Sequence, residues 1–456
     1  MTELHVSSNS PRSQSLPNGV EAPYDWALEQ LRIPQAHEVT RGHKDVVVAV
    51  IDIGYTFHPD HEGHLWTNPN PNHGDVHGWD FAEDDASLEY DGSNPRDYSR
   101  DHQAFVVGEV AAVAPDCPIM ILRDGYEPHH RASWGRAVRY AVDHGARVLA
   151  LPHGYITQDP ESGIPLFHKG TDFSYPGDNV EFLEALDYAY EKGALVIRGA
   201  ADNRGRRVAV PFNALESVVS VGSTNRHRAA APTIAASTDY VEVAAPGGES
   251  PTDDPSEKIW GTGGNGAYVP FAGGCMACGF GAAVAGLVVS RYPELSNQEI
   301  RQILRNTADG VGWDTYLGHG ILDPHRALTL SPEALRKAVT ILPDESQIRR
   351  ESGRAVVEVA IRNSGVFDVD RVLVVVYNGD PTTAADPTAT MKNPKILLRK
   401  QLGHSIVSAP GLEQVRAEVE IDLQDGHQEL FAQASALDLG AAGVFDTTDL
   451  VARKIG

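Results

Sequence analysis

Short apolar runs alternate with helical patterns between residues 25 and 330, and this alternation restricts the possible folds more than any other feature of the sequence. The runs are VVVAVID (46–52), PIMILR (118–123), RVLALP (147–152), ALVIRGA (194–200) and SVVSVGS (217–223). The helical patterns include residues 134–146 and 180–194, each with a glycine close to its end, as helices tend to have. Continuous apolar strands separated by helices predict an α/β fold in which helices cover both faces of a parallel sheet.

A different pattern begins after Pro332. It predicts short alternating strands at 355–363, 371–379, 415–423 and 429–437. Turns rich in Gly, Asp, Asn and Pro separate them, which is typical of a small β-sandwich of immunoglobulin-like type. The first residues of the chain are rich in Ser, Pro and Asn and have no periodicity. The sequence therefore predicts a flexible N-terminal tail (1–23), an α/β domain (24–330) and an all-β sandwich domain (331–456).

The charge of the chain restricts its partners. Acidic side chains outnumber basic ones by 62 to 38, which gives a formal charge of -24. The field of such a protein repels phosphate backbones and anionic lipids, so we expect no nucleic-acid partner and no membrane partner. The start of the chain lacks the apolar core of a signal peptide, and the cysteines are few and odd in number. These features favour a cytoplasmic protein.

Polar residues that follow the apolar runs are the first candidates for a site, because sites in open parallel sheets form at the carboxyl ends of the strands. Asp52 ends the first run, His102 opens the helical stretch HQAFVVGEVAA, and Asn203 ends IRGAADN. An Asp, then a His, then a nucleophile on a later helix is one of the known orders of the hydrolase triad. The order predicts that Asp52 orients His102 and that His102 activates the nucleophile.

At this point the residues resemble the subtilisin-like proteases, over about residues 24–330. The segment VAVID with the HPD that follows it is similar to that family's aspartate segment. Further landmarks match in order, namely DVHGWDF (75–81), APDCPIMILR (114–123), YAYEKGALVIRGAADNRG (188–205) and GHGILDPHRAL (318–328). The resemblance implies a subtilisin-like three-layer fold and a peptide or protein as substrate.

Two functional motifs of that family are altered. HQAFVVG is similar to the family's His-Gly-Thr-His-Val-Ala-Gly, which places His102 on the catalytic histidine and Phe105 on the second one. The segment 201–203 resembles Ala-Gly-Asn, so the resemblance implies that Asn203 donates to the oxyanion.

The substrate-binding edge Ser-Leu-Gly of the family becomes Pro152, His153 and Gly154. Pro152 has no N–H group to pair with an extended peptide, so we expect substrate binding to differ from the family's extended mode.

The nucleophile segment, FAGGCMACGFGAAVAG (271–286), contains no serine. Its local identity to Gly-Thr-Ser-Met-Ala places Cys275 at the nucleophile, whereas gapless counting back from Val284 places Cys278 there. A third alignment, with Phe280 directly after the nucleophile, places Gly279 there and predicts an inert protein. We favour Cys278, because three inserted residues would rotate the start of the helix by most of a turn.

A thiol beside an imidazole preserves nucleophilic catalysis, which here predicts a peptidase or peptide acyl-transferase that works through a thioester. The alternative is a catalytically dead pseudoprotease that binds peptides or acts as a scaffold, with Asp52 and His102 kept as a hydrogen-bonded pair. In either case the C-terminal domain is a possible site for a protein partner.

We assign no cofactor and no metal. Cys275 and Cys278 form a CxxC, but the sequence has no second CxxC or nearby histidine pair to complete a zinc site. Several histidines crowd one region, and all but the first, which belongs to the family's His-Pro-Asp, are interpreted as solvated loop residues; they are His58, His61, His64, His73 and His77. The acidic residues 83–85 lack the spacing of an EF-hand.

Overall fold

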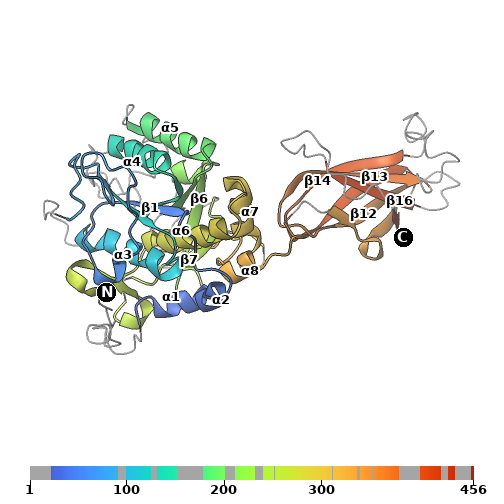
Figure 1. Cartoon of the computed structure of the whole chain (residues 1–456). Helices are drawn as coiled ribbons and strands as arrows, with labels where there is room; N and C mark the ends of the chain where they lie inside the picture. Colours follow the sequence, from blue (N-terminus) through green and yellow to red (C-terminus); the bar gives the residue numbers. More distant parts are fainter. Residues whose placement is uncertain are drawn as a thin grey trace, which may run out of the picture. The chain divides into compact units, whose positions relative to one another are not determined.

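The computed structural model describes residues 22–90, 99–124, 131–152, 178–200, 211–231, 240–250, 252–310, 312–335, 339–351, 353–378, 401–422, 430–436 and 453–455. The chain divides into two compact units, Met1–Thr329 and Leu330–Gly456 (Figure 1). This division lies one residue away from the boundary expected from the change in periodicity. Each unit is described by itself below.

A seven-stranded sheet forms the centre of the first unit, and every neighbouring pair in it is parallel. Its order is β2-β3-β1-β4-β5-β6-β7. The strands are β1 (Val47–Asp52), β2 (Gly78–Asp80), β3 (Ile119–Arg123), β4 (Ala146–Leu151), β5 (Leu195–Gly199), β6 (Val218–Thr224) and β7 (Val243–Pro246). The five apolar runs form β1 and β3 to β6, so the predicted parallel sheet is confirmed.

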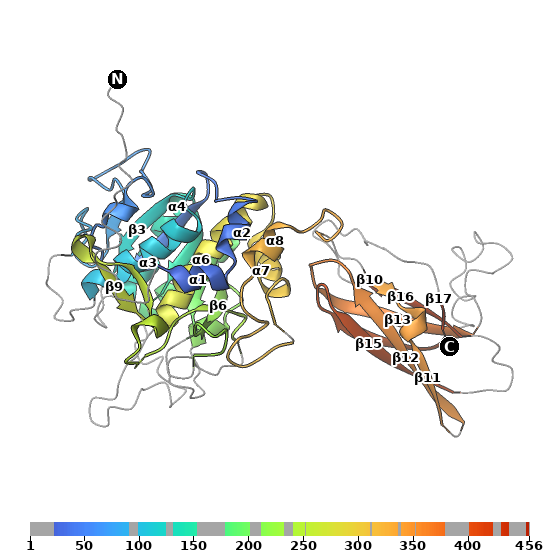
Figure 2. The same cartoon turned by 90° about the horizontal axis from the view of Figure 1, so that it is seen from below.

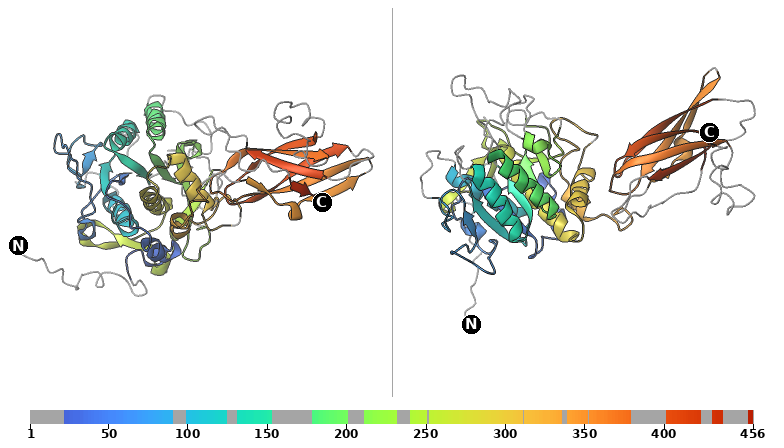
Figure 3. Two further views of the ribbon diagram at one scale, coloured as in Figure 1. Left: turned by 45° about the vertical axis from the view of Figure 1, so that its right-hand side comes forward. Right: turned by 90° about the horizontal axis from the view of Figure 1, so that it is seen from above.

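Helices α4 (Arg131–Asp143) and α5 (Asp178–Glu191) lie side by side over one face of this sheet (Figures 1 and 3). Alternate residues of each strand point toward them, for example Val47, Ala49 and Ile51 of β1. Trp134 of α4 and Phe182 of α5 meet edge to face with their ring centroids 5.4 Å apart. This apolar layer fixes the helices on the sheet without using any residue of the predicted site.

The opposite face carries α3 (Ser99–Val113) and α6 (Gly274–Arg291), which pack against each other (Figure 2). α6 is built mainly from Gly, Ala and Val, and small residues let it lie close to the strands: a Cβ on Gly281 would stand 3.0 Å from the Val221 side chain. The helix has a mean hydropathy of 1.5, within the range of a membrane span, but 83% of that window is buried inside the unit. Its apolar character is therefore explained by packing under the sheet.

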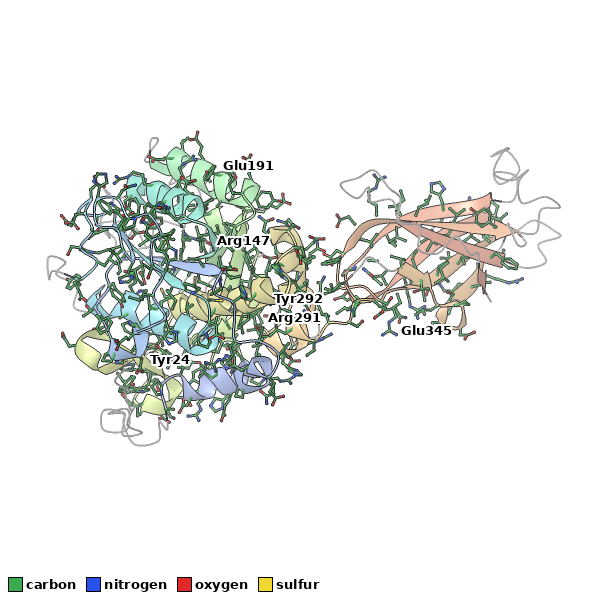
Figure 4. All side chains as sticks on the ribbon, in the orientation of Figure 1. Tyr24, Arg147, Glu191, Arg291, Tyr292 and Glu345 are labelled. Atoms are coloured by element: carbon green, nitrogen blue, oxygen red, sulfur yellow. The ribbon has the colours of Figure 1, made fainter. Side chains whose placement is uncertain are left out.

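The C-terminal end of α6 is tied to the helices that follow it, α7 (Asn297–Asn306) and α8 (Pro324–Leu328). Arg291 lies over the ring of Tyr292, 5.0 Å from its centroid, and the Tyr292 hydroxyl donates to Ala327 O at 3.1 Å. Figure 4 shows both side chains at this end of the helix. The long core helix is thus held at its far end as well as along its length.

The chain enters the first unit through α1 (Asp25–Gln30) and α2 (Ile33–His37). Tyr24, just before α1, inserts its ring between Gly108 of α3 and Gly261 of the hairpin formed by β8 (Ile259–Thr262) and β9 (Tyr268–Phe271). A Cβ on Gly261 would stand 2.2 Å from the Tyr24 ring, so only glycine fits there.

The second unit contains two antiparallel four-stranded sheets, which share one apolar core. The first sheet contains β10 (Val339–Ile341), β11 (Gln347–Glu351), β12 (Arg354–Asn363) and β15 (Gln414–Asp422). The second contains β13 (Val369–Asn378), β14 (Gln401–Ala409), β16 (Leu430–Ala436) and β17 (Arg453–Ile455). Along β15, buried and exposed residues alternate, as expected for a strand with one face on a core. The predicted all-β second domain is confirmed at this level.

Candidate active site

The site begins at the carboxyl end of β1, the third strand of the sheet, at which the order of strand addition reverses. Asp52 ends β1 and is fully buried. One of its oxygens, Oδ1, accepts the backbone N–H of Ile53 at 2.8 Å, and the other, Oδ2, lies 2.7 Å from Nδ1 of His102. The predicted Asp–His pair is therefore present, and the carboxylate is held in one orientation.

Gln103, the residue after the histidine, fixes α3 to the strands. Its side-chain amide donates to Val50 O at 2.9 Å and to Leu122 O at 3.0 Å, so it spans β1 and β3. Since both acceptors are backbone atoms of the sheet, the first turn of α3 cannot slide relative to Asp52 without breaking two buried hydrogen bonds.

Cys275 completes the arrangement. It is the second residue of α6, is partly buried, and has a side-chain hydrogen bond with His102. Because Nδ1 of His102 faces Asp52, the opposite ring nitrogen is the one available to the sulfur. The ring of Phe271 stands perpendicular to the His102 ring with the centroids 5.7 Å apart and forms one wall of the site. Asp52, His102 and Cys275 thus form a continuous hydrogen-bonded series.

The favoured assignment of the nucleophile to Cys278 is corrected by these contacts. Cys278 is fully buried, and its thiol donates to Ile197 O of β5 at 3.2 Å, away from the substrate side of the site. α6 runs without interruption from Gly274, so the helix needs no insertion before it. Gly279 lies one residue further along, facing α3.

Close backbone contacts position the first turn of α6. A Cβ on Gly199, at the end of β5, would stand 2.4 Å from Gly274 O, so β5 can approach this turn only with glycine at that position. On the other side, Gly273 N donates to Gly247 O at 2.9 Å, which ties the loop to the segment after β7. The location of Cys275 is therefore set by contacts with β5 and with the segment after β7, which lie on the other side of β1 from β3 in the strand order.

The electrostatics of His102 favour its charged form. Burial lowers the pKa of His102, but the Asp52 carboxylate and then Cys275 raise it, and the net result is a pKa well above the ordinary value. Burial raises the pKa of the Cys278 thiol far above the usual range. The two cysteines therefore differ: Cys275 contacts His102, whose charged form the Asp52 carboxylate favours, whereas burial keeps the Cys278 thiol protonated.

The remaining predicted residues are only partly described. Pro152 follows β4 and is buried, whereas Asn203, His153 and Gly154 lie outside the residues that the structure describes. Phe105, at the place of the family's second histidine, is fully buried; its ring lies edge to face with Tyr24 at 5.3 Å and with Phe271 at 5.1 Å. Phe105 therefore gives Phe271 an apolar neighbour where the family has a histidine.

Glu109 was missed by the sequence analysis. It lies on the buried face of α3, is fully enclosed, and neither of its carboxyl oxygens has a hydrogen-bond partner among the described residues. Burial and then the Asp52 carboxylate raise the pKa of Glu109 well above its ordinary value, which keeps the side chain neutral. The signal for it was a lone acidic residue in the otherwise small and apolar stretch from 104 to 112.

The interpretation of the histidines as solvated was wrong for His61. It is fully buried between Tyr55 and Thr262, whose side-chain oxygens lie 3.0 Å from its two ring nitrogens. Burial lowers the pKa of His61 to about 3, so this ring is a neutral structural residue. Within the described ranges, no three His, Cys, Asp or Glu side chains are grouped so as to hold a metal ion.

Comparison with known proteins shows the family to which the chain belongs. Residues 43–320 match the model of the subtilase family. Fervidolysin from Fervidobacterium pennivorans is 25% identical over 339 residues, covering 66% of this chain and 43% of that protein. The halolysin-like extracellular serine protease Nep from Natrialba magadii is 28% identical over 334 residues, covering 70% of this chain and 54% of that protein. The chain therefore spans about half the length of these relatives.

Solved structures show the same fold. A lanthipeptide protease superimposes with a TM-score of 0.54 at 24% identity, covering 67% of this chain and 93% of that one. The epidermin leader peptide processing serine protease of Staphylococcus aureus gives a TM-score of 0.53 at 18% identity, covering 67% of this chain and 80% of that one.

Proposed function

The chain belongs to the subtilase family, and from this premise we propose that it is a peptidase or peptide acyl-transferase whose nucleophile is the Cys275 thiol. The observation that carries the proposal is the continuous contact from Asp52 through His102 to Cys275. A serine needs a neutral histidine to remove its proton, whereas a cysteine beside a charged histidine is already a thiolate. The Asp52 carboxylate, which favours the charged form of His102, supports the second case.

In the proposed reaction the Cys275 thiolate attacks the carbonyl carbon of a peptide bond. The C–S bond forms as the carbonyl oxygen becomes an oxyanion, and we expect the backbone at the start of α6 to contribute to its stabilisation. When the tetrahedral intermediate collapses, the C–N bond breaks and His102 gives its proton to the leaving amine. Asn203 is the second oxyanion donor that the family resemblance implies. Asp52 holds the His102 ring in place throughout.

The product of this step is a thioester on Cys275, and neutral His102 can then accept a proton from an attacking water or amine. Amines compete with water far better for a thioester than for an ester. We therefore propose that the site joins peptides as well as cutting them, and that transfer to an amine exceeds hydrolysis when an amine is present.

The test uses the second cysteine of α6 as a matched control. A peptide carrying a C-terminal electrophile should label wild-type protein and Cys278→Ala at Cys275, and should not label Cys275→Ala or His102→Ala. A peptide ester mixed with an amine should give amide in preference to free acid in the first two proteins. If Cys275→Ala is labelled as fast as wild-type protein, or no variant is labelled, the enzyme proposal fails and a peptide-binding pseudoprotease is favoured.

A further inference from the structure

Two cysteines lie on the first turn and a half of α6, and only one of them is used by the proposed reaction. Cys275 and Cys278 are three residues apart, so their side chains lie on the same face of the helix. The rise and radius of an α-helix place the Cα atoms of such residues roughly 5 Å apart. This separation lies inside the range of about 4.4–6.8 Å that disulfides span.

The two thiols differ in access and in ionisation. Cys275 is partly exposed and contacts His102, whose charged form favours the thiolate, the species that reacts with oxidants. Cys278 is fully buried and protonated, with its thiol donating to Ile197 O. An oxidant from solvent therefore reaches Cys275 first. Cys278 can react only with the oxidised form of Cys275.

The third cysteine is excluded by distance. Cys117 faces the other end of α6, where its sulfur lies 3.4 Å from Ser290 Oγ and 3.9 Å from Gly286 O. Gly286 is eight residues beyond Cys278, or about 12 Å along the helix axis. Neither Cys275 nor Cys278 can bond to Cys117 while α6 is folded.

The first turn of α6, which must adjust when the disulfide forms, has few hydrogen bonds within the helix itself. The first N–H groups of any helix lack intrahelical partners, and the residue before α6, Gly273, has no side chain to cap them. Rotation of the two side chains toward each other costs two hydrogen bonds, the one from Cys278 to Ile197 O and the one between Cys275 and His102.

We propose that Cys275 and Cys278 form a reversible disulfide that protects the site and switches it off under oxidising conditions. The chemistry of the disulfide stands on the geometry alone, whereas its effect on acyl transfer rests on the function proposed above.

The oxidation proceeds in two balanced steps with hydrogen peroxide as oxidant. The Cys275 thiolate attacks one peroxide oxygen, so that an S–O bond forms, the O–O bond breaks, and the released hydroxide takes a proton from His102 to become water. The Cys278 sulfur then attacks the sulfenic sulfur of Cys275. The S–S bond forms, the S–O bond breaks, and the Cys278 proton leaves with the hydroxide as water. Two thiols have lost two electrons to one peroxide, and a dithiol reductant reverses the change.

The experiment treats the full-length protein with hydrogen peroxide, blocks the remaining thiols with iodoacetamide after denaturation, and weighs the tryptic peptide that ends at Arg291. Both cysteines lie in this one peptide, because no Lys or Arg occurs between Lys258 and Arg291. We expect it to lose two hydrogen atoms, to carry no iodoacetamide adduct, and to regain both thiols with dithiothreitol. Cys117→Ala should behave as wild-type protein does.

The matched variant is Cys278→Ser, whose hydroxyl can keep the hydrogen bond to Ile197 O. In this variant Cys275 should advance to sulfinic acid, which dithiothreitol does not reverse. The proposal is overturned if wild-type Cys275 reaches sulfinic acid as fast as in Cys278→Ser, with Cys278 still free. Because the readout is a mass, it is independent of turnover: a disulfide without acyl transfer would refute only the proposed function.

Discussion

The carboxyl group of Glu109 occupies the place where a side chain at position 279 would begin. An ideal Cβ on Gly279 would stand 1.8 Å from Glu109 Oε2, so α3 and α6 approach each other here with a glycine facing a neutral acid. The contact lies one residue from Cys278 and beneath the Asp–His pair.

Gly279→Ala tests this contact. We expect it to lower the free energy of unfolding by about 1–3 kcal/mol, since overpacking a close-packed core costs this much, although alanine is the better helix former. In a Glu109→Ala background the same change should cost much less, because the carboxyl group is gone and only the Val106 side chain, 3.0 Å from the added Cβ, must still adjust. Urea unfolding of the four proteins measures both values. Equal destabilisation in the two backgrounds would show that the carboxyl group is not the obstacle.

The pH dependence of stability tests the raised pKa of Glu109. Unfolded, the group releases its proton near its ordinary pKa; folded, it holds the proton to higher pH. Its contribution is therefore complete below the unfolded pKa and is lost as pH rises through the folded one, with a slope of up to about 1.4 kcal/mol per pH unit. Glu109→Gln should reduce this slope without abolishing it, because burial also raises the pKa of Asp124. Unfolding in urea at a series of pH values measures it, with the exposed Glu62→Gln as control.

Thiol labelling tests the different surroundings of the cysteines. Cys275 should react with iodoacetamide much faster than Cys117 or Cys278 in the native protein, because burial raises the pKa of both other thiols. A charged His102 stabilises the neighbouring thiolate, so fast labelling of Cys275 should extend to lower pH than labelling of the other two thiols. His102→Ala should slow it. Slow and equal labelling of all three cysteines would argue against an ion pair at the site.

Gly199→Ala tests how the nucleophile is positioned. The added methyl group would meet Gly274 O and push the first turn of α6 away from β5. We expect labelling by a peptide electrophile to fall by on the order of 100-fold, since small displacements of reacting groups cost this much. Circular dichroism should show the fold retained. Undiminished labelling in a folded variant would mean that this turn adjusts freely.

Truncation after Leu330 tests the independence of the two units. The first unit buries apolar residues on both faces of its parallel sheet. The apolar core of the second unit contains only residues that follow Thr329. We expect the truncated chain to unfold cooperatively and to keep the fast-reacting cysteine. An insoluble or molten product would instead show that the first unit needs the second for stability.

The sequence was sufficient for the elements whose pattern is long and regular. β1, β3 and β5 come from continuous apolar runs, and α4 and α5 from helical periodicity, so each lies within a few residues of its prediction. β2 has only three residues and includes a glycine and an aspartate, and β7 is short and rich in alanine. Such strands are formed by their neighbours in the sheet, and local pattern cannot reveal them.

The site was predictable where a residue type coincides with the end of a strand or the start of a helix, as for Asp52 after β1 and His102 in the first turns of α3. The prediction of the nucleophile failed because it depends on the direction in which each side chain leaves the helix. Cys275 and Cys278 are chemically alike and three residues apart, and contacts distant in sequence, such as those of Gly199 and Gly247 with the start of α6, position the turn that carries them. Buried polar residues were the other failure: His61 reads as a loop residue, and its partner Thr262 is distant in sequence.

The double attachment of Gln103 to β1 and β3 has a consequence for how such a site can change over evolutionary time. The Asp52–His102 pair is anchored to one part of the sheet, and Cys275, the proposed attacking residue, is anchored separately, through Gly199 and Gly247, to another. Substitutions confined to a single helical turn can therefore exchange, silence or restore the attacking atom while the pair remains intact. An undisturbed aspartate and histidine are thus a poor diagnostic of activity in divergent members of the family, and the chemistry must be judged at the helix terminus.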